Sequence, residues 1–187
     1  MPLLLLIFAY IAGSINFSII IFKLTGNGDP RDAFSGNPGM TNVYRQSGLT
    51  MAGVVLLMDV GRSFLVAAMA VSMLSGGWVP WIGFALIVGN RYPCFHGFRG
   101  GKGVANYLGF SLWSVPFAVL ISALSWLLCY AVVRIPFIGS FVMVSILAYA
   151  SMSHCAFRPW CSAGVMVTVL FIFLSHRRNL SELVGKG

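Results

Sequence analysis

Long apolar stretches make up most of the chain, and short groups of charged residues, glycines and prolines separate them. The apolar stretches lie at about 2–22, 50–74, 78–94, 104–115, 117–133, 136–153 and 160–175. About 20 apolar residues are enough for a helix to cross a bilayer. The pattern predicts an all-α polytopic membrane protein with about seven transmembrane helices and glycine-rich cytoplasmic loops.

The segment 104–133 decides between six spans and seven. It is longer than one ordinary span requires, and Pro116 at its centre removes a helix hydrogen bond. Basic residues are enriched in cytoplasmic loops. With seven spans and the N-terminus outside, most of the 12 basic residues are cytoplasmic, namely Lys23, Arg31, Arg45, Arg91, Arg99, Lys102, Arg134, Arg177, Arg178 and Lys186. Arg158 then lies outside and Arg62 within a span, so the charges favour seven spans.

Composition excludes a soluble globular protein. The chain is 58% hydrophobic and 9% charged, whereas a soluble surface carries roughly 25–35% charged residues. The net charge of +8 therefore indicates membrane orientation rather than nucleic-acid binding. The stretch 2–22 lacks the basic start of a signal peptide. We expect it to be the retained first helix of a single domain over residues 1–187.

The four cysteines give no strong metal signal. Cys94 and Cys129 lie in apolar stretches, where a free cysteine behaves as a small hydrophobic residue. Cys155 and Cys161 flank a short loop and can pair if that loop faces an oxidising compartment. His154 lies beside them, but two cysteines and one histidine are too few for a zinc site.

Two glycine-rich segments carry candidate phosphate ligands. The first combines small polar residues and glycine with one arginine: Ser35, Gly36, Asn37, Thr41, Asn42 and Arg45. Arginine grips phosphate with two parallel hydrogen bonds, although composition alone is equally typical of a turn-rich loop. The second places Lys102 among Gly100, Gly101 and Gly103, directly before a predicted helix. It is not a nucleotide-binding P-loop, because His96 and Gly103 replace two residues which that motif requires.

Two further polar pairs stand three residues apart. His176 and Asn179 follow the last apolar stretch and would share one helical face, where the histidine is a candidate general base or merely an interfacial residue. Asp59 and Arg62 lie inside the second stretch. Charges at membrane depth usually pair and face a bundle interior, so we expect this pair to support the structure rather than to react.

The segments SGNPGMTNVYR (35–45), FRGGKGVA (98–105) and HRRN (176–179) resemble the three motifs of the bacterial acyl-phosphate:glycerol-3-phosphate acyltransferases, the PlsY family. Their order and spacing match, and the resemblance runs over the whole chain. It implies seven spans in the bacterial inner membrane, with the motifs facing the cytoplasm. It also implies transfer of a fatty acyl group from acyl phosphate to the 1-hydroxyl of glycerol 3-phosphate, giving lysophosphatidic acid and phosphate, the first step of phospholipid synthesis.

The resemblance also implies roles for the motif residues. Arg45 and Lys102, with the small polar residues of the first segment, would hold the two substrate phosphates, and the 100–103 loop would add backbone N–H groups. The base would be His176, positioned by Asn179, or a phosphate oxygen of a substrate. Acyl phosphate is already activated, so we expect no cofactor, metal or covalent intermediate. We expect a monomer, and an oligomer stays open as the alternative.

The sequence departs from the usual family pattern at Asn16, Asn90, Arg62 and Glu182. A divergent paralogue that binds phosphorylated lipid precursors, either without catalysis or with an altered substrate, therefore stays open as the alternative.

Overall fold

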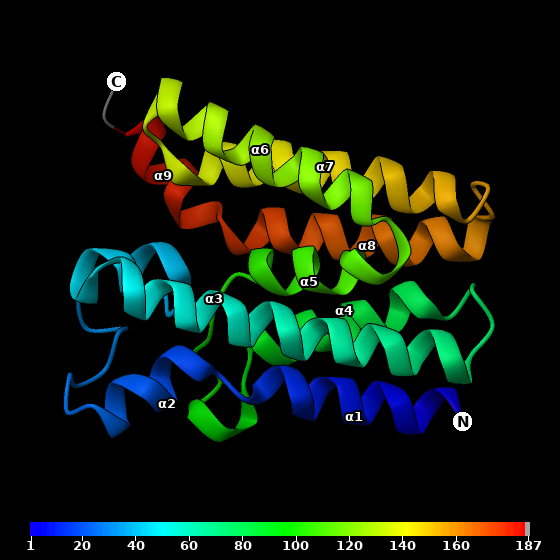
Figure 1. Ribbon diagram of the computed structural model, residues 1–187, viewed down its shortest axis with the longest axis horizontal. Coiled ribbons are helices and arrows are strands. Elements are labelled where there is room, and N and C mark those ends of the chain that lie inside the picture. The colour runs from blue at the N-terminus through cyan, green and yellow to red at the C-terminus, as the bar shows by residue number, and fades with distance from the viewer. Residues whose placement is uncertain (186–187) are drawn as a thin grey trace.

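The computed structural model describes residues 1–185, and the predicted position of Lys186 lies outside them. These residues form helices and no strands. The elements are α1 (Pro2–Ser14), α2 (Phe17–Leu24), α3 (Met40–Met73), α4 (Val79–Arg91), the short 3-10 helix η1 (Cys94–His96), α5 (Val104–Ser114), α6 (Pro116–Val133), α7 (Pro136–His154), α8 (Pro159–Ser175) and α9 (Arg177–Val184). The longer helices run along the long axis of the molecule (Figure 1).

Every predicted apolar stretch is helical, but not every helix is long enough to span. Four segments among the described residues have the length and hydropathy for a membrane crossing: 2–24, α3, α6 and α7. A fifth results if α8 and α9, bent by 48°, count as one span. With 13 and 11 residues, α4 and α5 rise only about 20 and 17 Å, well short of a hydrocarbon core of ~30 Å. The integral membrane class is confirmed, and the number seven stays a prediction.

Two predicted boundaries differ in the structure. The first stretch breaks between α1 and α2, where the side chain of Asn16 caps α2 by accepting a hydrogen bond from the N–H of Ile19 (3.4 Å). The second helix begins at Met40 rather than near residue 50. Gly48, with φ of 79°, divides α3 into two parts. The polar end of the first motif is therefore helical and not part of a loop.

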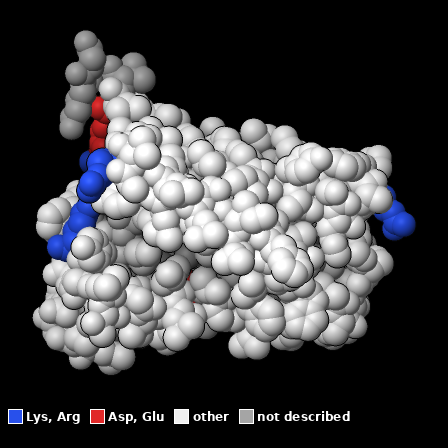
Figure 2. All heavy atoms as spheres, turned by 45° about the horizontal axis from the view of Figure 1, so that its top comes forward, with Lys and Arg blue, Asp and Glu red and all other residues white. Residues whose placement is uncertain are grey.

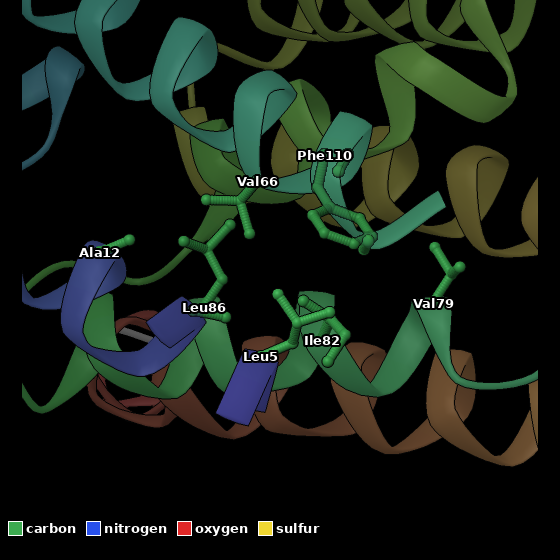
Figure 3. Packing of buried hydrophobic residues seen from close by; sticks show 10 residues of the cluster. Leu5, Ala12, Val66, Val79, Ile82, Leu86 and Phe110 are labelled. Atoms are coloured by element: carbon green, nitrogen blue, oxygen red, sulfur yellow. The ribbon is translucent and has the colours of Figure 1, made fainter. Parts of the chain in front are cut away.

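The core contains several layers of closely packed helices. Figure 3 shows α1, α3, α4 and α5 meeting through Leu5, Ala12, Val66, Leu86 and Phe110. A second cluster joins α4, α5, α6, α7 and α8. Helix α6 lies at the edge of the bundle, and only 11% of its residues are buried.

Glycines allow α1 and α4 to cross with their backbones in contact. A Cβ atom on Gly13 would lie 2.0 Å from the carbonyl oxygen of Leu86. A Cβ atom on Gly89 would lie 2.1 Å from that of Tyr10. Small residues at such crossings are typical of helices packed within membranes. This contact anchors the helix that leads into the second motif.

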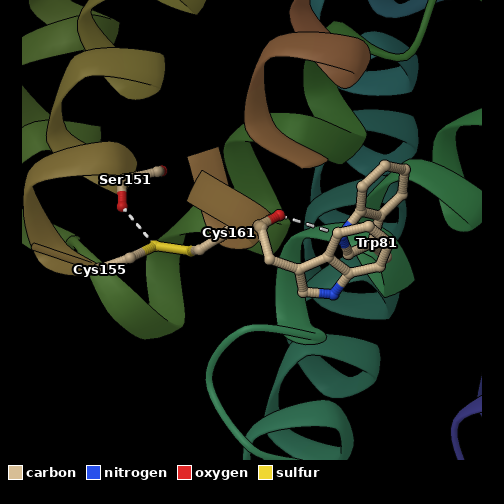
Figure 4. The surroundings of a disulfide bond; sticks show 5 residues. Trp81, Ser151, Cys155 and Cys161 are labelled. Carbon is tan, nitrogen blue, oxygen red and sulfur yellow. Dashed lines mark hydrogen bonds between the residues drawn. A yellow bond between two sulfur atoms is a disulfide. The ribbon is translucent and has the colours of Figure 1, made fainter. Parts of the chain in front are cut away.

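The two ends of the bundle differ in charge. Basic side chains gather at one end of the surface, and a broad uncharged surface separates them from a smaller basic patch at the other (Figure 2). The turn between α7 and α8 lies at the same end as the N-terminus (Figure 1). There Cys155 and Cys161 form a disulfide, and the Sγ atom of Cys155 lies 3.1 Å from the carbonyl oxygen of Ser151 (Figure 4).

Candidate active site

A pocket of about 360 Å³ brings the three sequence motifs together. The predicted site residues that line it are Ser35, Asn37, Thr41, Asn42, Arg45, Gly101, Lys102, Gly103, His176 and Asn179. Gly36 and Gly100, predicted as substrate ligands, are not among the lining residues. The pocket thus unites segments that are up to about 140 residues apart in the sequence.

Asn42 organises the first motif. It is only 2% exposed, and its amide donates to the carbonyl oxygens of Pro30 (2.8 Å) and Ala33 (3.3 Å). Its side-chain oxygen accepts a hydrogen bond from the N–H of Ser35 (3.3 Å). These bonds use most of the capacity of the amide. Asn42 therefore shapes the loop that presents Ser35 and its neighbours to the pocket.

The start of α2 also supports this loop. The hydroxyl of Ser18 lies 2.9 Å from the carbonyl oxygen of Pro38 and 2.8 Å from the side-chain oxygen of Asn16. Asn16 and Ser18 are both buried. The family departure at Asn16 thus belongs to a hydrogen-bonded group that fixes the position of the first motif.

The glycines of the second motif serve close packing more than ligand binding. The N–H groups of Gly100 and Gly101 donate to the carbonyl oxygens of Arg91 (3.0 Å) and Asn90 (2.9 Å). Both N–H groups therefore already have partners within the chain. Gly103 has φ of 84°, and a Cβ atom there would lie 2.5 Å from a methyl carbon of Ile87.

Helix α5 begins directly after Gly103, so its first turn opens at the pocket. The first N–H groups of a helix lack intrahelical partners, and the positive end of the helix dipole favours anions. The N-terminus of α5 and Lys102 are therefore the candidate anion-binding groups of this motif.

Lys102 links the second motif to the third. Its ammonium donates a hydrogen bond to the side-chain oxygen of Asn179 in α9. Burial, supported by the nearby charge of Arg91, lowers the pKa of Lys102 from 10.5 to about 8. The ammonium is therefore still mostly charged at neutral pH, and it is less hydrated than a surface lysine. Such a group favours an anionic ligand that restores the missing solvation.

His176 lies where α8 ends and α9 begins, so a bend interrupts the continuous helical face predicted for His176 and Asn179. The imidazole is 3% exposed, and its Nδ1 lies 2.9 Å from the carbonyl oxygen of Ile172. A carbonyl oxygen only accepts, so Nδ1 carries the proton and the lone pair of the neutral ring is on Nε2. Both His176 and Asn179 line the pocket despite the bend.

Arg45 differs from Arg31 and Arg178, whose side chains form ion pairs. Its side chain is exposed and lines the pocket, and no hydrogen bond or ion pair holds it within residues 1–185. Arg31, in contrast, is held by Asp29 at 2.6 Å. Arg178 is held by Glu182 at 3.0 Å, which accounts for the departure at Glu182 as a surface ion pair. Arg45 is therefore free to bind an anion.

The pocket also contains polar residues that were not predicted as ligands. Asp59 and Arg62 form the expected ion pair at 3.1 Å. Asp59, Asn90 and Asn106 line the pocket, and each is at most 7% exposed. Asn90 and Asn106 interrupt otherwise apolar stretches, and this was the available signal in the sequence.

One wall of the pocket is apolar. Its side chains come from α3, α5, α6 and α7: Leu56, Leu108, Ala123, Trp126, Leu127, Phe137 and Met143. Leu127 is also 56% exposed on the outer surface of α6. The pocket therefore extends from the polar motifs to the surface that faces lipid.

The pocket joins candidate anion-binding groups to an apolar wall within a membrane-embedded bundle. This combination is typical of a membrane protein that acts on molecules with both a phosphate and an apolar chain. Residues 3–186 match the family described as glycerol-3-phosphate acyltransferase. The chain belongs to this family and is an integral membrane acyltransferase.

Relatives and solved structures agree with this assignment. The glycerol-3-phosphate acyltransferase of Pseudomonas paraeruginosa is 36% identical over 96% of this chain and 94% of its own. That of Azotobacter vinelandii is 37% identical with the same coverage. The crystal structure of PlsY, an integral membrane glycerol 3-phosphate acyltransferase in its glycerol 3-phosphate form, is similar with a TM-score of 0.90 and 33% identity, covering 99% of this chain and 92% of that one. Its lysophosphatidic acid form has a TM-score of 0.87 at 32% identity.

Proposed function

We propose that the protein transfers a fatty acyl group from acyl phosphate to the 1-hydroxyl of glycerol 3-phosphate, releasing lysophosphatidic acid and inorganic phosphate. The observation that carries the proposal is the single pocket in which Arg45, Lys102 and the start of α5 meet an apolar wall open to lipid. Both substrates carry phosphate, and one also carries an alkyl chain. The pocket offers a complementary surface to each of these groups.

In this proposal Arg45 and Lys102 bind the two phosphates, assisted by Ser35, Asn37 and Thr41. The alkyl chain lies along Trp126 and leaves between helices past Leu127. These contacts hold the hydroxyl within about 3 Å of the acyl carbon, which is the main catalytic requirement for an activated donor. The hydroxyl proton passes to Nε2 of His176 or to a substrate phosphate oxygen.

We further propose that the motif end of the bundle faces the cytoplasm and that the N-terminus lies outside. The basic residues gather at the motif end, as expected for the cytoplasmic side. The disulfide between Cys155 and Cys161 lies at the same end of the bundle as the N-terminus, as expected if that end faces an oxidising compartment. Charge and cysteine chemistry thus support the same orientation.

The test is an assay of the purified protein with palmitoyl phosphate and glycerol 3-phosphate, measuring lysophosphatidic acid and phosphate. A parallel reaction with palmitoyl-CoA decides the donor. Arg45→Ala and Lys102→Ala should each lower the rate on the order of 100-fold or more. Lys23→Ala removes an exposed charge at the same end, outside the pocket, and should leave the rate unchanged. An inactive wild-type protein would refute the proposal and favour a non-catalytic lipid-precursor binder.

A further inference from the structure

Asn106 occupies a special position in the pocket. It lies in the first turn of α5, is 2% exposed and lines the pocket. An asparagine in an apolar stretch requires hydrogen-bond partners, because an unpaired buried amide costs stability. Its partners determine which way the amide points.

The neighbours of Asn106 fix its orientation. The guanidinium of Arg62 contacts the side-chain oxygen of Asn106, and the hydroxyl of Ser63 lies 3.0 Å from the same oxygen. A guanidinium can only donate, so the atom facing it must be the amide oxygen. The NH₂ group is then on the other side, and none of residues 1–185 accepts a hydrogen bond from it. Two donors therefore remain available for a ligand in the pocket.

Arg62 is itself firmly held. It pairs with Asp59 at 3.1 Å, donates to the carbonyl oxygen of Ile15, and lies 5.1 Å from the ring centroid of Phe17. A charge-assisted bond to the amide oxygen polarises the amide and strengthens its N–H donors. The carboxylate of Asp59 compensates the buried charge of Arg62. This network makes Asn106 a preorganised donor.

The place of Asn106 along the pocket indicates which substrate atom it meets. Lys102 and Gly103 precede it in the chain on the anion-binding side, and Leu108 follows it on the apolar wall. In an acyl phosphate the carbonyl group lies between the phosphate and the alkyl chain. We propose that the NH₂ group of Asn106 donates to the acyl carbonyl oxygen and stabilises the oxyanion formed during transfer. This proposal rests on the proposed function.

The step balances with groups already present. The hydroxyl oxygen of glycerol 3-phosphate bonds to the carbonyl carbon, the carbonyl π electrons move to oxygen, and the hydroxyl proton passes to the base. The electron pair then returns, the bond from carbon to the phosphate oxygen breaks, and phosphate leaves with that pair. Asn106 stabilises the negative oxygen between these two events, and Asp59 and Arg62 act only as positioning residues.

Kinetics separate this role from a structural one. Asn106→Ala should lower kcat on the order of 100-fold, as for removal of one oxyanion donor, and change the KM for glycerol 3-phosphate less than about threefold. If the alanine variant does not fold, Asn106→Asp takes its place, because the carboxylate keeps an acceptor for Arg62. This variant lacks the NH₂ group and should lower kcat at least as much. Ser111→Ala, a buried change in α5 outside the pocket, should leave kcat unchanged. A kcat within about threefold of wild type in a folded Asn106 variant would overturn the inference.

A spectroscopic measurement requires only the wild-type protein. The probe is 1-oxohexadecylphosphonate labelled with ¹³C at the carbonyl, which lacks the bridging oxygen and cannot transfer its acyl group. Its carbonyl stretch should shift to lower frequency on binding, because hydrogen bonds weaken the C=O bond. A stretch equal to that in a protein-free micelle, at a concentration where the probe inhibits, would refute the contact. If the wild type is active but the carbonyl stretch of the probe does not shift, only the role of Asn106 is rejected. If the wild type is inactive, the proposed function is rejected.

Discussion

The charge of Lys102 offers the sharpest test of phosphate binding in the pocket, because Lys102 loses this charge over a defined pH range. Burial lowers the pKa of this ammonium to about 8 in the free enzyme. Such a group is roughly nine-tenths protonated one pH unit below its pKa and roughly one-tenth protonated one unit above. If the charged form binds phosphate, kcat/KM for glycerol 3-phosphate should fall about tenfold across these two units. Substrate phosphates, with a second pKa near ~6, are already ionised there.

The matched variant is Lys102→Arg. A guanidinium keeps its proton throughout this range, so the fall should disappear even if the variant is slower overall. Initial rates of lysophosphatidic acid formation from labelled glycerol 3-phosphate, at saturating palmitoyl phosphate and with enzyme-free blanks, provide the profile. A flat wild-type profile would refute the reasoning. A fall with the same midpoint in Lys102→Arg would assign the titration to another group.

Three further predictions concern stability, each measured by thermal or denaturant unfolding in detergent. The folded-state pKa of Lys102 lies below its ordinary value of 10.5, so the charge on Lys102 lowers the stability of the folded protein below about pH 8. The free energy of unfolding of the wild type should therefore rise between about pH 8 and 10.5. Lys102→Met should be more stable than the wild type at neutral pH and should not show this rise. Gly89→Ala should cost about 1–3 kcal/mol by overpacking, whereas Gly53→Ala, where a Cβ atom meets nothing within 4 Å, should be neutral or stabilising; equal losses would contradict the crossing of α1 and α4. Cys155→Ser should lower the free energy of unfolding by about 2 kcal/mol. Alkylation of the unreduced wild type should label only Cys94 and Cys129, and labelling of Cys161 would contradict the disulfide.

Hydropathy predicted the helices well because lipid imposes a strict rule on chain segments that cross it. The starts of α6 and α7 follow from Pro116 and Pro136, which favour the first helical positions. The start of α3 did not follow from hydropathy. Its first turns are polar and are separated from the apolar part by Gly48, so their helical form depends on capping and packing rather than on hydrophobicity.

The candidate site was predictable as a set of residues but not as a set of contacts. Motif resemblance identified Arg45, Lys102 and His176, and the structure places all three at one pocket. Resemblance did not show that the N–H groups of Gly100 and Gly101 are already bonded within the chain. The orientation of such groups depends on partners distant in sequence, and a single sequence does not reveal which residues those are.

The apolar wall that ends at Leu127 gives the proposed reaction two exits in two different phases. Inorganic phosphate leaves into water, whereas lysophosphatidic acid diffuses sideways between helices into the membrane. Product inhibition should therefore have two independent components, one set by the dissolved phosphate concentration and one by the mole fraction of lysophospholipid in the bilayer. An enzyme that consumes lysophosphatidic acid elsewhere in the same membrane would relieve the second component without contacting this protein, because the lipid itself carries the product between them.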